Sequence, residues 1–396
     1  MKAPTAYLPN LTPLRGLAAL FTVVFHLNIG SQALLNSKAS LVIDKMYLMV
    51  DFFFVLSGFI LMHVYAERFQ GSVTGNGFKK FGIARFARVY PLHLFTLLYL
   101  VGLRVWFLSA GGIDNPWRAV SYRWDALPTN LLLVQAMNIH DWFSWNNAAW
   151  SISTEWWMYM LFPFLVKPFF RLNAAGRVAV MLACFGGYLG IMFLIQPIVR
   201  FAEPMAFVKP LVAGSLNVAY DWGFLRCAFG FVIGTMMYLG YKDGWAKSLF
   251  GNGTVFVLLA LGMFACLHFG VPDVCTVAFF PLLLLSAAYG SPRMDAFFGT
   301  KPLQRIGDWS FSIYLVHQPI LYTIEMVTAY LNPPKPGAAP SGPPPEPDRL
   351  MGWLTALAFI AITLLLSFLT YRFIEVPARN WINKRFDTKK RAIEAA

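Results

Sequence analysis

The stretch LRGLAALFTVVFHL, residues 14–27, is almost wholly apolar but contains Arg15 and His26. In a helix, the eleven-residue separation corresponds to roughly three turns plus 20°, so both side chains lie on one face about 16 Å apart. Burying an ionisable group in a membrane helix is costly, and such a residue is by default a functional hypothesis. Arginine suits paired hydrogen bonds to a phosphate, and histidine suits proton transfer near neutral pH. The spacing therefore predicts an anion-binding group and a general base on one helix face.

Two carboxylates are expected near the depth of His26. Asp51 lies in VDFFFVLSGFI and Glu155 lies in WSISTEWWMY, each close to the outer end of its own apolar segment. A carboxylate bonded to an imidazole orients the ring and stabilises its charged form. We therefore predict that His26, Asp51 and Glu155 are catalytic residues that converge in the outer half of the membrane. The alternatives are a packed histidine bonded to neighbouring backbone and, for Asp51, a helix cap at the interface.

A pair of arginines precedes another apolar segment, in the sequence KKFGIARFARVYPLH. Arg85 and Arg88 are three residues apart, so in a helix they face the same way. The planar guanidinium group donates paired hydrogen bonds to phosphate oxygens. We predict that both arginines face the cytoplasmic mouth and bind phosphate there. The alternative is an ordinary basic loop of the cytoplasmic side.

The remaining ionisable residues give weaker signals. His317, in DWSFSIYLVHQPI, either lines the same cavity or packs against it. The four cysteines show no CxxC spacing or zinc-type pairing with histidine. There is also no Gly-rich phosphate loop, GxSxG elbow or HExxH motif. We predict no metal.

The elements that must position these residues are membrane helices. Of the 396 residues, 58% are hydrophobic and 13% are charged, about half the charged share of an ordinary soluble protein. Apolar runs long enough to cross a bilayer recur along the chain. We predict an all-α, polytopic membrane protein with about ten spans, near residues 11–30, 46–66, 89–108, 149–168, 178–198, 223–241, 254–270, 272–290, 309–330 and 351–373.

Loop composition predicts the orientation and the domain organisation. With ten spans, the basic loops and the basic tail, residues 374–396, fall on one side, which should be the cytoplasm and should hold both termini. A Pro-rich loop, residues 332–349, should lie outside and is typical of extended backbone. The apolar segment LPTNLLLVQAM, residues 127–137, is too short to cross and is interpreted as an interfacial or re-entrant helix. Residues 1–396 are expected to form a single membrane domain.

Several motifs in this order resemble the acyltransferase-3 family of integral membrane acyltransferases, which includes bacterial O-acetylases of surface polysaccharides. The resemblance rests on LRGLAALFTVVFHL, VDFFFVLSGFIL, ARFARVYPLH, WSISTEWWMYMLFP, FSIYLVHQPI and FIEVPARNWI. The residues that match the Arg-to-His, Arg-x-x-Arg and Trp-Ser-x-Ser-x-Glu motifs are Arg15, His26, Arg85, Arg88, Trp150, Ser151, Ser153 and Glu155.

The resemblance implies ten core spans and transfer of an acyl group, usually acetyl, from acyl-coenzyme A. It also implies that His26 acts in catalysis and that the arginines serve the donor. Ser151, Ser153 or Trp150 would donate to the developing oxyanion, and His317 is grouped with them at the substrate site. Direct transfer and prior acylation of His26 both satisfy these residues.

The predicted function is transmembrane O-acylation in the bacterial inner membrane. Acetyl-CoA or another acyl-CoA would be the donor from the cytoplasm, and a hydroxyl of an extracytoplasmic or lipid-linked saccharide would be the acceptor. Three tryptophans on the outer side, Trp142, Trp145 and Trp150, are expected to offer a stacking surface for sugars. The alternative is a transporter or flippase of a polysaccharide precursor, and a third possibility is a scaffold without chemistry. No nucleic-acid partner is expected.

Overall fold

The computed structural model describes residues 7–29, 34–198, 215–333 and 348–386. Within these ranges the chain is helical and has no strand, which confirms the all-α class. The first half contains α1 (Leu11–Asn28), η1 (Met46–Leu48), α2 (Met49–Phe69), α3 (Gly75–Ser109), α4 (Pro116–Ser121), η2 (Trp124–Ala126), α5 (Leu127–Leu131), α6 (Ala149–Phe170), α7 (Ala174–Gly190), η3 (Ile191–Ile195) and η4 (Gln196–Ile198). The second half contains α8 (Gly223–Lys242), α9 (Lys247–Phe250), α10 (Gly253–Phe269), α11 (Asp273–Val277), α12 (Phe279–Tyr289), α13 (Pro292–Phe298), α14 (Lys301–Asp308), α15 (Ser310–Leu331), α16 (Arg349–Thr370), η5 (Tyr371–Glu375) and α17 (Val376–Phe386).

Every predicted span coincides with one of these helices or with a run of them. Six helices in the described ranges are long and apolar enough to cross a membrane, and a pair bent by 98°, formed by Asp273–Tyr289 and Pro292–Phe298, would raise the number to seven. Helices α6 and α15 have 22 residues each and are not among the six. An integral membrane protein is supported, and the count of ten spans remains a prediction.

Close packing of α2 against α8 forms the centre of the helix bundle. Gly230 and Gly234 on α8 are four residues apart, the spacing that lets two membrane helices approach each other closely. A Cβ atom at Gly234 would lie 1.8 Å from the carbonyl oxygen of Val55, and one at Gly58 would lie 1.9 Å from that of Phe231. The absence of side chains at these positions therefore fixes which faces of α2 and α8 meet.

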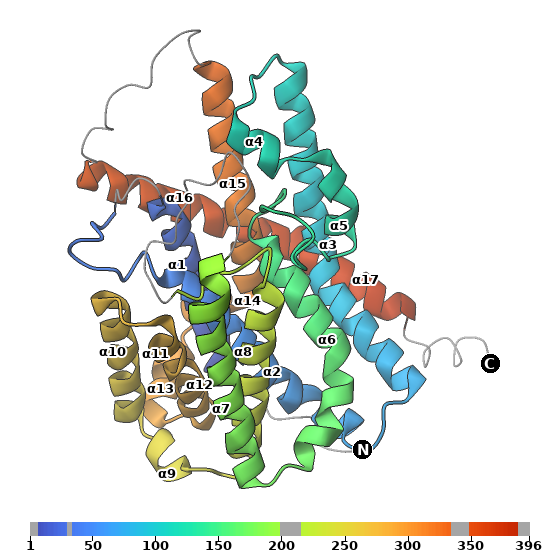
Figure 1. Ribbon diagram of the computed structural model, residues 1–396, viewed down its shortest axis with the longest axis vertical. Coiled ribbons are helices and arrows are strands. Elements are labelled where there is room, and N and C mark those ends of the chain that lie inside the picture. Colours follow the sequence, from blue (N-terminus) through green and yellow to red (C-terminus); the bar gives the residue numbers. More distant parts are fainter. Residues whose placement is uncertain (1–6, 30–33, 199–214, 334–347, 387–396) are drawn as a thin grey trace.

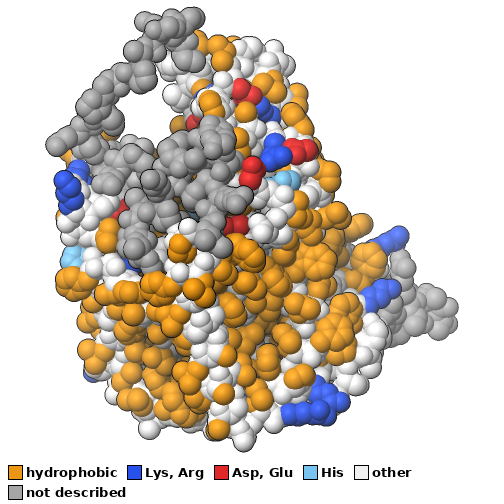
Figure 2. Space-filling model, viewed as in Figure 1, with side chains coloured by type: hydrophobic (Ala, Val, Ile, Leu, Met, Phe, Trp, Pro, Cys, Tyr) orange, Lys and Arg blue, Asp and Glu red, His pale blue; other side chains and the backbone are white. Residues whose placement is uncertain are grey.

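The ends of α3 and α15 project from the bundle together with α4 (Figure 1). The apolar surface is continuous over the lower part of the molecule, whereas acidic and basic side chains occur together near this projecting end (Figure 2). Ion pairs of the projecting end include Arg118 with Glu325 and Arg123 with Asp125. Hydrogen bonds from Arg123 lower the pKa of Asp125, so this carboxylate stays charged. The charges are appropriate for a part of the chain that lies in water.

The predicted interfacial segment, residues 127–137, contains only one short helix, α5 (Leu127–Leu131). The chain leaves the helical conformation at Leu133, which has a φ of 55°. The carbonyl of Leu133 accepts hydrogen bonds from two side chains of α6, Ser153 and Trp157. The rest of the segment is therefore a loop held against α6. Most of the predicted Pro-rich loop, residues 332–349, and the end of the basic tail lie outside the described residues.

Candidate functional site

A pair of histidines joins α1 to α15. Nδ1 of His26 lies 3.2 Å from Nε2 of His317, and the ring centroids are 5.0 Å apart. His317 is fully buried, whereas His26 is half-buried. His317 lies on α15, one helical turn after Tyr314. The first residue of the same helix, Ser310, accepts a hydrogen bond from Arg15. The sequence left two possibilities for His317, and the structure places it beside His26.

The backbone determines the tautomer of both rings. Nδ1 of His26 lies 2.9 Å from the carbonyl oxygen of Thr22, and Nδ1 of His317 lies 3.2 Å from that of Ile313. A carbonyl oxygen only accepts, so each Nδ1 carries the hydrogen. Nε2 of His317 is then an acceptor for the Nδ1–H of His26, and Nε2 of His26 has a lone pair. This arrangement suits a general base at Nε2 of His26, since a partner already stabilises the other nitrogen when the ring becomes charged.

A cavity of about 400 Å³ lies next to the histidine pair. On α2 it extends from Val64 to Phe53, eleven residues or about 16 Å of helix. The end of the cavity at Phe53 also includes Tyr314, and the centroids of these two rings are 5.8 Å apart. The centroid of the Tyr314 ring is 6.0 Å from that of His317. His26 is not among the lining residues. The ring of Tyr314 therefore lies between the cavity and His317.

All three predicted arginines, Arg15, Arg85 and Arg88, line this cavity. Arg15 donates to the hydroxyl of Ser310 at 2.7 Å and to the carbonyl of Gly307 at 2.9 Å. These are neutral acceptors, so they hold the guanidinium group in place without cancelling its charge. The site fits an anionic ligand because three cationic groups share one hollow.

Arg85 and Arg88 have different environments within the cavity. Arg85 donates to the hydroxyl of Tyr65 at 3.0 Å, and its Nε is buried without a partner in the described part of the chain. Arg88 pairs with Glu375, which is buried at the end of the π-helical segment η5 and also accepts from Ser312 at 3.0 Å. Sequence reasoning missed Glu375. The quoted stretch FIEVPARNWI contained it, but no distance along the chain linked it to Arg88.

The structure places Glu155 at the cavity and not against His26. Its carboxylate accepts from the hydroxyl of Ser57 on α2 and lies in the cavity lining with the arginines. Ser151 lines the same cavity one turn earlier on α6, and its hydroxyl lies 2.8 Å from that of Tyr314. The predicted pairing of Glu155 with His26 is therefore corrected. Both lie near the site, but α6 turns Glu155 toward the arginine end.

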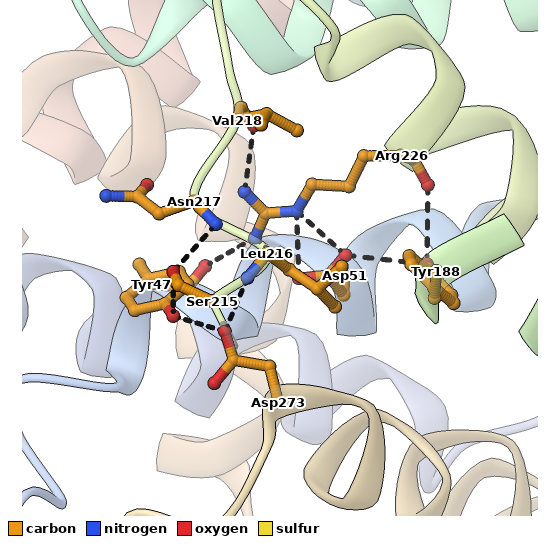
Figure 3. Close-up of polar contacts among 9 residues, drawn as sticks. All are labelled: Tyr47, Asp51, Tyr188, Ser215, Leu216, Asn217, Val218, Arg226 and Asp273. Carbon is orange, nitrogen blue, oxygen red and sulfur yellow. Dashed lines mark hydrogen bonds and ion pairs between the residues drawn. The ribbon is translucent and has the colours of Figure 1, made fainter. Parts of the chain in front are cut away.

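Asp51 does not contact His26 either, and its partner is Arg226 (Figure 3). Nε of Arg226 lies 2.9 Å from Oδ1 of Asp51 and Nη2 lies 2.5 Å from Oδ2, a bidentate geometry with both side chains buried. Tyr188 also donates to Asp51, at 3.4 Å. Arg226 was missed although an arginine inside the predicted span 223–241 is itself a signal. This correction assigns to Asp51 a charged partner on α8.

A second buried ion pair, Lys45 with Asp273, adjoins the first, and Figure 3 draws its Asp273 together with Tyr47 and Leu216. Lys45 lies 2.9 Å from Asp273, and the hydroxyl of Tyr47 donates to the same carboxylate. The backbone N–H of Leu216 donates to Asp273 at 2.7 Å, and Arg226 donates to the carbonyl of Val218 at 3.1 Å. The two pairs thus hold the segment that precedes α8 against α2 and α11.

Two of the predicted oxyanion donors, Ser153 and Trp150, do not line the cavity. Ser153 is fully buried and donates to Leu133. The guanidinium group of Arg226 lies 5.5 Å from the centre of the Trp150 ring. The predicted sugar-stacking surface is also wrong in part, because Trp142 and Trp145 are only 8% and 1% exposed. Of the three hydroxyl or indole donors, Ser151 alone faces the cavity.

Known proteins that are similar to this chain include acyltransferases. The model of the family described as "Acyltransferase domain", of the acyltransferase-3 type, matches residues 9–372. "Acyltransferase MdmB" of Streptomyces mycarofaciens is 29% identical over 96% of this chain and 93% of its own length. "Peptidoglycan O-acetyltransferase OatA" of Listeria monocytogenes is 23% identical over 94% of this chain but only 56% of its own length. "Protein 2 in picA locus" of Rhizobium radiobacter is 41% identical over 24% of this chain and 48% of its own length.

No solved structure matches the chain significantly. The family match covers nearly the whole chain and includes the arginine cavity and the histidine pair described above. Membrane-like helices, a cationic cavity and adjacent imidazoles are compatible with acyl transfer within a membrane. The chain belongs to the acyltransferase-3 family of membrane acyltransferases.

Proposed function

We propose that this protein transfers an acyl group, in the simplest case acetyl, from cytoplasmic acyl-CoA to a hydroxyl of an extracytoplasmic or lipid-linked saccharide. The observation that supports the proposal is a cavity that three arginines line and whose lining residue Tyr314 lies beside His317, the partner of His26. The length of about 16 Å along α2 suits a long thin arm with its phosphates at the mouth and its thioester inside. The name of the relative OatA, an O-acetyltransferase of peptidoglycan, supports a saccharide hydroxyl as acceptor. The bacterial inner membrane is the proposed location.

The proposed reaction forms one ester bond and breaks one thioester bond. The acceptor hydroxyl attacks the thioester carbonyl while Nε2 of His26 takes its proton. His317 accepts from Nδ1–H of His26 and stabilises the imidazolium. The Ser151 hydroxyl donates to the oxyanion, and the leaving thiolate receives the proton to give free coenzyme A. Prior acylation of His26 followed by transfer uses the same groups.

The step requires that Tyr314 moves, because its ring lies between the cavity and His317. The hydroxyl of Tyr314 lies 2.8 Å from that of Ser151. Breaking one neutral hydrogen bond costs about 1 kcal/mol, a small barrier for side-chain rotation. We propose that the arriving thioester displaces the ring of Tyr314 and takes its place beside Ser151.

The arginines are tested through the donor Michaelis constant. Replacing both Arg85 and Arg88 with glutamine is expected to raise the donor KM by about tenfold to a hundredfold, because two charge-assisted hydrogen bonds to phosphate are lost. The value of kcat should change little, since neither arginine adjoins the histidine pair. Initial rates at varied donor concentration measure both constants.

The matched control is the replacement of Lys79 and Lys80 by glutamine. These lysines precede the arginines on α3, do not line the cavity and carry the same total charge. A donor KM that rises equally in both double variants would indicate a general loss of positive charge, and an unchanged KM in the arginine variant would remove Arg85 and Arg88 from the donor site.

The proposed function as a whole is tested by thiol release. The purified protein in lipid nanodiscs is incubated with acetyl-CoA, with and without total membrane glycans, and free thiol and glycan-bound acetyl are both measured. We expect release that depends on the glycans and is matched by acetyl incorporation. A protein that binds no acetyl-, succinyl- or longer acyl-CoA, and instead moves a labelled glycan precursor across proteoliposomes, would support the transporter alternative.

A further inference from the structure

A proline interrupts the hydrogen bonds of α15 next to His317. Pro319 lies inside this helix and has no N–H group. In an α-helix that N–H would bond to the carbonyl four residues earlier, which here is the carbonyl of Leu315. Leu315 is two residues before His317 and is fully buried. A buried carbonyl without a hydrogen-bond partner destabilises the fold, so the carbonyl of Leu315 needs a donor from another element.

The missing donor comes from the loop that precedes α6. Nδ2 of Asn146 donates to the carbonyl of Leu315 at 3.0 Å and to the hydroxyl oxygen of Thr96 at 3.2 Å. Asn146 is only 2% exposed. Because Thr96 lies on α3, one carboxamide joins α3, α15 and the loop before α6 at the level of His317.

Ring packing holds α15 on the other side of the proline. Tyr322, three residues after Pro319, packs against the rings of Tyr122 and Trp117. Asn146 before the proline and this ring cluster after it therefore hold α15 in place.

We infer that Asn146 is a positioning residue that holds His317 against His26. The inference rests on the proposed function, in which His317 stabilises the charged form of His26. A proline position removes one of the hydrogen bonds that keep a helix regular, and the local direction of the backbone then depends on the replacement donor. Nδ1 of His317 bonds to Ile313 in the same turn, so a shift of this turn moves the ring directly.

The first test removes the donor and keeps the volume. Asn146→Leu keeps a similar side-chain volume but has no side-chain N–H donor. Asn146→Ala removes the same donor and leaves a smaller side chain. Both are expected to lower kcat for thiol release by about tenfold to a hundredfold, since displacement of a catalytic group by about 1 Å has effects of this size. The donor KM should stay within about twofold, because Asn146 does not line the arginine cavity.

The second test supplies the hydrogen bond in another way. Pro319→Ala restores an N–H group that can donate to the carbonyl of Leu315 within the helix. Relative to Pro319→Ala alone, the double variant Asn146→Ala with Pro319→Ala should show a kcat lower by less than about twofold. The control is Pro163→Ala, which restores an N–H group inside α6 and should leave the full effect of Asn146→Ala.

The outcomes separate this inference from the proposed function. Equal losses of kcat from Asn146→Ala in the wild-type and Pro319→Ala backgrounds would overturn the inference, as would wild-type kcat in both Asn146 variants while His317→Ala is impaired. Wild-type kcat in His26→Ala would instead overturn the proposed function. If Asn146→Ala alone fails to insert, the double variant with Pro319→Ala is measured instead. A double variant that folds but does not recover kcat would contradict a positioning role for Asn146.

Discussion

Replacing His26 with alanine is expected to lower kcat for acyl transfer by about a hundredfold to ten-thousandfold, the range that a general base contributes. The protein should still insert and bind the donor, because His26 does not line the arginine cavity. Its loss removes a half-buried ring from the end of α1 and leaves the large interface of α2 with α8 intact. Thiol release at saturating acetyl-CoA and donor binding, measured side by side, check this expectation.

A second set of variants tests His317, the hydrogen-bond partner of His26. His317→Ala removes one of the two acceptors for Nδ1–H of His26 and leaves the carbonyl of Thr22. A loss of about tenfold to a hundredfold is expected from one charge-assisted hydrogen bond. His317→Gln should recover part of the rate, since its side-chain oxygen can accept that hydrogen bond. The double replacement should be no slower than His26→Ala alone, because His317 acts through His26.

The control for both variants is His268→Ala. This histidine is bonded to Ser40 at 2.8 Å and lies outside the cavity, so wild-type rates are expected. Wild-type turnover of His26→Ala would show that the proton is taken elsewhere. A glutamine at position 317 that is no better than alanine would show that hydrogen-bond acceptance is not the function of His317.

The helices, and the helix faces that carry several of the site residues, could be predicted from the sequence. The spacing of Arg15 and His26 placed them on one helix face, and the structure brings both toward α15, Arg15 at Ser310 and His26 at His317. The loop arginines were expected to meet Arg15, and all three line one cavity. These inferences succeeded because period and hydrophobic length are properties of a single segment.

The identity of the partners could not be predicted in the same way. Matching depth brings residues to one level of the membrane, but the rotation of each helix about its axis decides which of them meet. Asp51, Val55 and Gly58 form one face of α2, and the close approach at Gly58 turns this face toward α8. On α8, Arg226, Gly230 and Gly234 recur every four residues. That stripe was visible in the sequence and is the signal that pairs Asp51 with Arg226 instead of His26.

Removing Asp51 is therefore expected to act on stability first. Asp51→Ala leaves Arg226 charged, fully buried and without its bidentate partner. Breaking a buried ion pair at one side typically costs about 3–5 kcal/mol. We expect a large loss of folded, detergent-extractable protein and a thermal midpoint well below that of the wild type, measured by size-exclusion chromatography after heating.

Removing both charges should be much less harmful than removing one. A double variant, Asp51→Leu with Arg226→Met, replaces the ion pair by apolar side chains of similar length, a change that is often neutral or stabilising. This variant should recover the thermal midpoint lost in Asp51→Ala. If Asp51 serves the fold, its kcat should recover as well, because His26 and His317 are unchanged.

The same double variant decides between the structural and the catalytic role of Asp51. A carboxylate that oriented His26 would be required for turnover in any stable background, so a stable but inactive double variant would reinstate Asp51 as the partner of His26. Recovery of both stability and kcat would instead show that the membrane helices are held by one ion pair, Asp51 with Arg226, while the proton chemistry depends on another pair, His26 with His317. The reaction would then need no buried carboxylate beside its base, since a neutral imidazole accepts the Nδ1 hydrogen bond in its place.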